Sequence, residues 1–153
     1  GVQMKTEKNE IRIAGLLKTS VADGPGVRSV LFLQGCSRNC PGCHNAGIST
    51  LDGGINFPID DLVGIIRAEC KNRKLTISGG EPLEQYSALL ELTGILKEDG
   101  FDLCVYTGAE LEDVSKELLQ NLHYIKTGRY IEELRISDNP FYGSKNQTFT
   151  TLY

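Results

Sequence analysis

The sequence predicts an α/β domain with a mainly parallel, open sheet. Apolar, strand-like stretches alternate with stretches in which apolar residues recur every three or four positions, as they do on one face of a helix. Such alternation calls for right-handed crossovers that pack helices onto a parallel sheet. A full eight-fold barrel needs about 250 residues. The chain has 153, so we expect part of a barrel that stays open on one side.

The first two predicted strands flank a loop. Residues 1–9 are polar and unpatterned, and we expect them to be disordered or derived from a tag, leaving a single domain over residues 10–153. Residues 10–17 alternate weakly as a strand, and residues 19–26 have the composition of a loop. Residues 27–34 contain a nearly continuous apolar run, which is typical of a strand buried on both faces.

A helix, a strand and a second helix are expected next. After a glycine-rich link at residues 52–56, one apolar helix face behind Pro58 is formed by Ile59, Leu62, Ile66 and Cys70. Cys70 is therefore predicted to lie in the core. Residues 75–78 form a short strand and residues 83–97 a helix that Gly100 ends. Its inward face is predicted to consist of Leu83, Tyr86, Leu90 and Leu96.

The last part of the chain repeats the alternation. Residues 102–106 are expected to form a strand, and a third strand–helix unit ends with a strand near Tyr124 and Ile125. The third helix is traced by Leu111, Val114, Leu118 and Leu122. Polar or glycine-rich loops follow three predicted strands, and since functional groups gather at the carboxyl ends of parallel strands, we expect these loops on one rim.

Composition excludes several classes of function. Sixteen basic and twenty acidic side chains give a net charge of −4 without a long block of either sign, which argues against a nucleic-acid surface. No apolar run reaches membrane-spanning length. Five cysteines are an odd number for a disulfide framework, and we see no secretory signal peptide. Reduced thiols and a cytoplasmic location are expected.

The most informative motif is a run of three cysteines, Cys36, Cys40 and Cys43. Four thiolates would close a zinc or iron–sulfur site, whereas three thiolates on a cubane of four irons leave one iron open for a small molecule. The run is also compatible with half of a zinc site in which His44 is the fourth ligand. An iron with an open coordination position favours a catalytic role of the metal site over a purely structural one.

The cysteine run after one strand, together with Gly79-Gly80-Glu81-Pro82 after another, resembles the radical S-adenosylmethionine superfamily. The resemblance implies a partial, open (β/α) barrel of the radical SAM type. It implies that the three cysteines are catalytic and hold a [4Fe–4S] cluster whose open iron binds the amino and carboxylate groups of S-adenosylmethionine. The remaining cofactor contacts that it implies are made by Gly42, Cys43, His44, Gly79, Gly80 and Glu81.

Two further stretches resemble the activases of glycyl-radical enzymes. The first is residues 23–28, which we expect beside the rim. There the family implies that Asp23 and Arg28 contact the peptide that receives the radical. The second is residues 138–147, which resemble the end of the activating enzymes of anaerobic, class III ribonucleotide reductase. The implied activity is reductive cleavage of S-adenosylmethionine to methionine and a 5′-deoxyadenosyl radical, which abstracts hydrogen from a glycine of the reductase large subunit. A flavodoxin or ferredoxin is the implied reductant.

The sequence departs from that family at Thr127, where an acidic residue is common. Beside it, Lys126 is interpreted as an exposed lysine at a strand end rather than as a charge near the cofactor. Two alternatives to the activase stay open. One is a compact radical enzyme that acts on a small molecule, similar to 7-carboxy-7-deazaguanine synthase, and the other is a non-catalytic metal-binding interaction module. Zinc without iron would favour the module.

Overall fold

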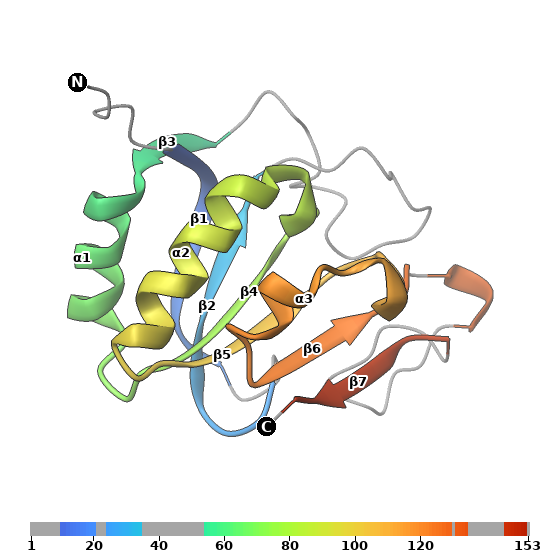
Figure 1. The fold of residues 1–153 in the computed structure, drawn as a ribbon. Helices are drawn as coiled ribbons and strands as arrows, with labels where there is room; N and C mark the ends of the chain where they lie inside the picture. The colour runs from blue at the N-terminus through green and yellow to red at the C-terminus, as the bar shows by residue number, and fades with distance from the viewer. Residues whose placement is uncertain (1–9, 21–23, 35–53, 130, 135–145, 153) are drawn as a thin grey trace.

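The structure is a computed structural model that describes residues 10–20, 24–34, 54–129, 131–134 and 146–152. These residues form one seven-stranded sheet in the order β3-β1-β2-β4-β5-β6-β7, with helices beside it (Figure 1). The strands are β1 (Glu10–Ser20), β2 (Arg28–Leu33), β3 (Ile55–Pro58), β4 (Lys74–Gly79), β5 (Asp102–Tyr106), β6 (Tyr124–Thr127) and β7 (Thr148–Thr151). The helices are α1 (Ile59–Glu69), α2 (Tyr86–Glu98) and α3 (Lys116–Leu119).

The sheet is mixed, so the prediction of a mainly parallel sheet is correct only for its centre. Strands β2, β4, β5 and β6 are parallel neighbours. At the two ends of the sheet, β1 pairs antiparallel with both β2 and β3, and β6 pairs antiparallel with β7. A short loop suffices for an antiparallel pair, whereas each parallel pair needs a long crossover. Each parallel pair is linked through an α-helix, which is α1, α2 or α3.

The register of the parallel strands brings their carboxyl ends to one edge. Leu33 of β2 lies opposite Gly79 of β4, and Ile77 of β4 lies opposite Val105 of β5. The loops after β4 and β5 therefore leave the sheet side by side. The described part of the expected rim is confirmed.

The three helices lie on the same side of the sheet (Figure 1). Their apolar residues, among them Leu62, Leu92 and Leu118, form one core with alternate strand residues such as Leu31 and Ile77. The opposite side chains of the central strands are also buried, and many of them are polar. We call these side chains the helix-free face, and they are Val30, Thr76, Ser78, Cys104, Tyr106 and Lys126.

Several predicted elements differ in detail. Strands β3 and β7 were not expected, because neither contains a buried residue and neither has the apolar run of a central strand. Of the inward residues predicted for the second helix, Leu96 is buried, and Leu83, Tyr86 and Leu90 pack against the core while only partly buried. The other buried residues of α2 are Ala88, Leu89, Leu92 and Thr93. The first half of the predicted third helix is a short 3-10 turn at Leu111–Asp113. The chain is extended at Val114, after which Ser115 caps α3 by accepting a hydrogen bond from the Leu118 amide at 3.1 Å.

Among the described residues, no helix is both long and apolar enough to cross a membrane.

Candidate active site at the carboxyl ends of the parallel strands

The loop after β4 packs directly on the end of β2. Gly79 has a φ of +104°, and a Cβ atom added to it would lie 2.3 Å from the backbone nitrogen and oxygen of Leu33. The Gly80 amide then donates a hydrogen bond to the Leu33 carbonyl at 2.9 Å. Because only glycine adopts this φ without strain and leaves this space free, the Gly79-Gly80 pair fixes the distance between the two strand ends.

Glu81 joins the ends of β4 and β5. Its carboxylate is 2% exposed and accepts hydrogen bonds from the Thr107 hydroxyl at 2.7 Å, the Gly108 amide at 2.8 Å and the Leu83 amide at 2.9 Å. The last bond caps the turn at Pro82–Gln85. Both carboxylate oxygens thus join the loop after β4 to the loop after β5. The sequence did not predict this contact, because Thr107 lies 26 residues away from Glu81.

Gln34 is the last described residue before the cysteine run. Its amide donates to the Arg12 carbonyl at 3.1 Å, and its own carbonyl accepts from the Gln85 side chain at 3.4 Å. Gln85 also bonds the backbone of Arg12, with its Oε1 accepting at 2.8 Å and its Nε2 donating at 2.9 Å. The point where the chain enters the cysteine run is therefore anchored beside the turn that follows Glu81.

The predicted cluster ligands lie outside the described residues. These are Cys36, Cys40 and Cys43, and the predicted cofactor contacts Gly42 and His44 lie there too. Within the described ranges, no group of three or more His, Cys, Asp or Glu side chains is placed to hold a metal ion.

The residues of the site fit the implied cofactors in two respects. A set of three thiols is the donor set of an iron–sulfur cluster with one open iron. The rim next to Gln34 carries Gly79 and Gly80, which have no side chains of their own, and a backbone carbonyl is an acceptor for an ammonium group.

Lys126 differs from its prediction. It is 7% exposed instead of lying in solvent, and its ammonium group stands 4.0 Å from the centre of the Tyr106 ring. The two residues are paired across β5 and β6, which places both on the helix-free face. Attraction between a cation and an aromatic face is strengthened by burial. Thr127, next along β6, is 2% exposed. A pairing between two strands cannot be read from either strand alone.

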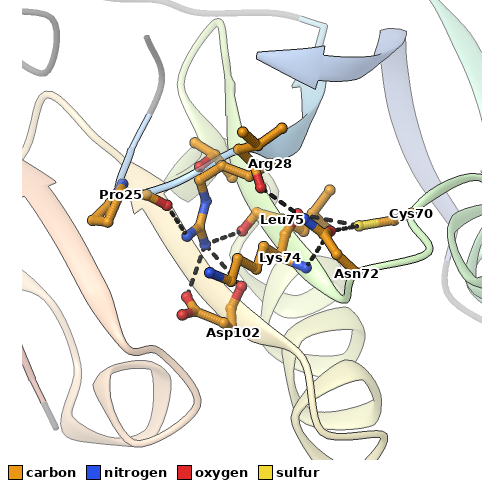
Figure 2. Close-up of polar contacts among 9 residues, drawn as sticks. Pro25, Arg28, Cys70, Asn72, Lys74, Leu75 and Asp102 are labelled. Atoms are coloured by element: carbon orange, nitrogen blue, oxygen red, sulfur yellow. Dashed lines mark hydrogen bonds and ion pairs between the residues drawn. The ribbon is translucent and has the colours of Figure 1, made fainter. Parts of the chain in front are cut away.

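Arg28 and the preceding residues 24–27 lie at the other edge of the sheet. Arg28 begins β2, so it stands at the amino ends of the parallel strands, away from Gly79 and Glu81. The expected position beside the rim is therefore wrong for Arg28, because its strand runs from this edge toward the rim. Its guanidinium is buried against β4 and β5 (Figure 2). Asp23 lies outside the described residues.

The other two cysteines belong to the interior. Cys70 is 1% exposed, as predicted, and its thiol donates to the Lys74 carbonyl at 3.1 Å (Figure 2). Cys104 is fully buried on the helix-free face, and burial raises the pKa of its thiol to about 12. A thiol that stays protonated at neutral pH is a poor metal ligand and a poor nucleophile.

Comparison with known proteins gives concordant matches. Residues 22–150 match the family described as 4Fe-4S single cluster domain. The anaerobic ribonucleoside-triphosphate reductase-activating protein of Vibrio cholerae is 32% identical over 83% of the chain and 89% of its own length. The protein of the same name from Haemophilus influenzae is 31% identical over 84% and 90%. The pyruvate formate-lyase-activating enzyme of Clostridium pasteurianum is 32% identical over 63% of the chain and 42% of its own length.

Proposed function

The chain belongs to the family described as 4Fe-4S single cluster domain and to the family of anaerobic ribonucleoside-triphosphate reductase-activating proteins, and from this membership we propose its reaction and its partner. The protein is a glycyl-radical activating enzyme of the radical S-adenosylmethionine type. Its substrate is a glycine-bearing loop of an anaerobic ribonucleotide reductase. The observation that carries the proposal is the 32% identity over 83% of the chain, a match that accompanies an intact three-cysteine run.

The cofactors of this reaction are a [4Fe–4S] cluster and S-adenosylmethionine. When bound, they supply reductive cleavage of the sulfonium to methionine and a 5′-deoxyadenosyl radical, which takes a hydrogen atom from the substrate glycine. Cys36, Cys40 and Cys43 hold the cluster. The protein contributes positioning of the reacting groups and exclusion of water, and the reaction itself calls for no general acid or base from the chain.

The residues of the rim are proposed to make the contacts with S-adenosylmethionine. The Gly79 and Gly80 carbonyls are proposed to accept hydrogen bonds from the methionine ammonium. Gly42 and Cys43 are proposed to contribute to cofactor binding, and His44 to contact the cofactor near its adenine. For Glu81 we propose a contact with the ammonium that is secondary to its bonds with Thr107 and Gly108, which hold the Gly79-Gly80 loop in place.

The sheet is proposed to be the wall of a partial, open (β/α) barrel of the radical SAM type. With α1, α2 and α3 on one side, the helix-free face is its inner wall. The polar residues Thr76 and Ser78 of this wall are buried.

The proposal includes one further residue and one further partner. Asp23 contacts the substrate peptide, and a flavodoxin or ferredoxin supplies the electron. Reduced thiols favour a cytoplasmic location.

The test is electron paramagnetic resonance on protein reconstituted with iron and sulfide without oxygen and reduced with dithionite. We expect a reduced [4Fe–4S] signal that changes when S-adenosylmethionine is added, and a glycyl radical when the anaerobic reductase is present. A cluster signal that ignores the cofactor would contradict the proposal. One zinc atom per chain without iron would favour a metal-binding module instead.

A further inference from the structure

We propose that Asn146 and Gln147 are positioning residues for the cofactor site, because they hold the end of β6 in place and the end of β6 in turn keeps the rim ordered for S-adenosylmethionine. The two side chains contact the backbone after β6 and act on the cofactor through this backbone. That the ligand of the rim is S-adenosylmethionine rests on the proposed function. The hold itself follows from hydrogen bonds between described residues.

Two side-chain amides bind the backbone that follows β6. Thr127 is the last residue of β6 and the last that pairs with β7. Beyond it, Gln147 Nε2 donates to the Gly128 carbonyl at 3.0 Å. Asn146 Nδ2 donates to the next carbonyl, that of Arg129, at 2.8 Å. Side-chain donors thus continue the attachment for two residues after the backbone pairing has ended.

The backbone of Gly128 also lies against the segment that carries the two amides. Gly128 is buried and has a φ of +102°, a region that glycine enters without strain. A Cβ atom added to it would lie 3.3 Å from both the Asn146 carbonyl oxygen and Gln147 Cα. The two segments are therefore in close contact, and a shift of residues 146–147 would leave the turn at Gly128 without its support.

Hydrogen bonds connect the end of β6 with the loop after β4. The Gly128 amide donates to the Ala109 carbonyl at 2.8 Å. The Ala109 amide donates to the Thr107 hydroxyl at 3.1 Å, and this hydroxyl donates to the Glu81 carboxylate at 2.7 Å. A series of hydrogen bonds therefore runs along the rim from residues 146–147 to the loop that is proposed to bind the methionine ammonium.

The position of β7 gives a physical reason for these extra bonds. β7 is the last strand at one edge of the sheet and has only four residues (Figure 1). The ends of such elements open locally at a low cost in free energy. Because β7 runs antiparallel to β6, its first residue lies beside the rim, where opening would disturb the end of β6. Two amide donors at this point keep the rim ordered, and a site that is ordered in advance loses less conformational entropy when its ligand binds.

The experiment compares Asn146→Ala with a matched control, Asn72→Ala. Asn72 Nδ2 donates to the Val27 carbonyl at 2.8 Å, the same distance as in the bond from Asn146. This bond lies at the amino edge of the sheet, since Asn72 precedes the first residue of β4 by two positions. The two variants therefore remove the same side-chain atoms and equivalent hydrogen bonds at opposite edges. Gln147→Ala is a second test variant, because it removes the neighbouring bond to Gly128.

Two quantities are measured on protein reconstituted with iron and sulfide. One is hydrogen exchange of the peptide that contains Gly128, read by mass spectrometry, and the other is the Kd for S-adenosylmethionine, read from the electron paramagnetic resonance signal of the reduced cluster. In Asn146→Ala and Gln147→Ala we expect the exchange rate at Gly128 and the Kd each to rise about tenfold, a usual size for coupling between two sites. Iron content should not change. Asn72→Ala should leave the exchange rate at Gly128 and the Kd as they are.

The unaltered protein gives a reciprocal test. Because coupling between two sites is mutual, a hold that favours cofactor binding must be strengthened by cofactor binding. Adding S-adenosylmethionine should therefore slow hydrogen exchange at Gly128. Exchange around Asn72, at the opposite edge of the sheet, should stay the same.

Three results would overturn the inference. Unchanged exchange at Gly128 in both test variants would mean that the two amides do not hold the end of β6. Faster exchange with an unchanged Kd would mean that this hold does not reach the cofactor, and an equal rise of the Kd in Asn72→Ala would make the effect unspecific. A cluster in the unaltered protein that ignores S-adenosylmethionine would refute the proposed function and the inference with it, whereas the three results above leave the proposed function standing.

Discussion

The Thr107 hydroxyl donates a hydrogen bond of 2.7 Å to the Glu81 carboxylate, and this buried contact joins the ends of β4 and β5. The direction of the bond is set by a second one, in which the same hydroxyl accepts from the Ala109 amide at 3.1 Å. A carboxylate that accepts only from donors around it cannot be exchanged for a group that donates. The loop that carries Gly79 and Gly80 therefore depends on the identity of one side chain.

Glu81→Gln should destabilise the protein by about 1–3 kcal/mol, seen as a lower urea midpoint. One oxygen becomes an NH2 group, which in either orientation faces a backbone donor, the amide of Leu83 or that of Gly108. Glu84→Gln is the control, since Glu84 is exposed in the same turn and should change stability by less than about 0.5 kcal/mol. Equal midpoints for the two variants would show that the contact between the strand ends contributes nothing.

Two glycine substitutions should have opposite effects. Gly79→Ala places a Cβ atom 2.3 Å from the Leu33 backbone at a φ of +104°, so we expect loss of soluble protein or a destabilisation of about 3 kcal/mol or more. Gly64→Ala lies in the middle of α1 with nothing within 4 Å of the added atom, and it should stabilise the protein by about 1 kcal/mol. Thermal unfolding of both variants measures the contrast, and a tolerated Gly79→Ala would contradict the close approach of the two strand ends.

Cys104 should make the protein less stable at alkaline pH. Burial raises the pKa of its thiol from 9.0 to about 12. Between these values the folded state keeps a proton that the unfolded state releases, so stability is complete below about pH 9 and falls as the pH rises toward 12. Going from pH 8 to pH 10 should cost about 1 kcal/mol more in the unaltered protein than in Cys104→Ala. Urea midpoints at both pH values test this, and parallel losses would refute it.

The iron content should depend on three of the five cysteines. Replacing Cys36, Cys40 or Cys43 by alanine should reduce iron after reconstitution from about four atoms per chain to a small fraction of that, because a cluster needs its thiolate ligands. Cys70→Ser should retain iron, since serine can keep the hydrogen bond to the Lys74 carbonyl. Loss of iron in Cys70→Ser would overturn the assignment of the cluster to the three-cysteine run.

Local patterns predicted most elements of the sheet and its helices. The apolar run of β2 and the helical spacing of Ile59, Leu62 and Ile66 each lie within a few residues, and burial of these stretches confirms them. The third helix was predicted too long because its spacing continues across Val114, although the chain is extended there. Ser115 caps the shorter α3 and lies 2.6 Å from the Tyr86 hydroxyl, a contact that no helical pattern contains.

The sequence by itself determined the chemistry of this protein. Three thiols at a fixed spacing and two glycines after a strand are local features, and their meaning depends on residue type and separation along the chain. The tertiary structure decided where charges lie. Lys126 is buried against the Tyr106 ring, and the Glu81 carboxylate accepts hydrogen bonds from Thr107 and Gly108. Arg28 lies beside Asp102, at the edge of the sheet opposite the expected rim. These contacts join residues on different strands, so they depend on strand order and register, which arise only when the whole sheet assembles.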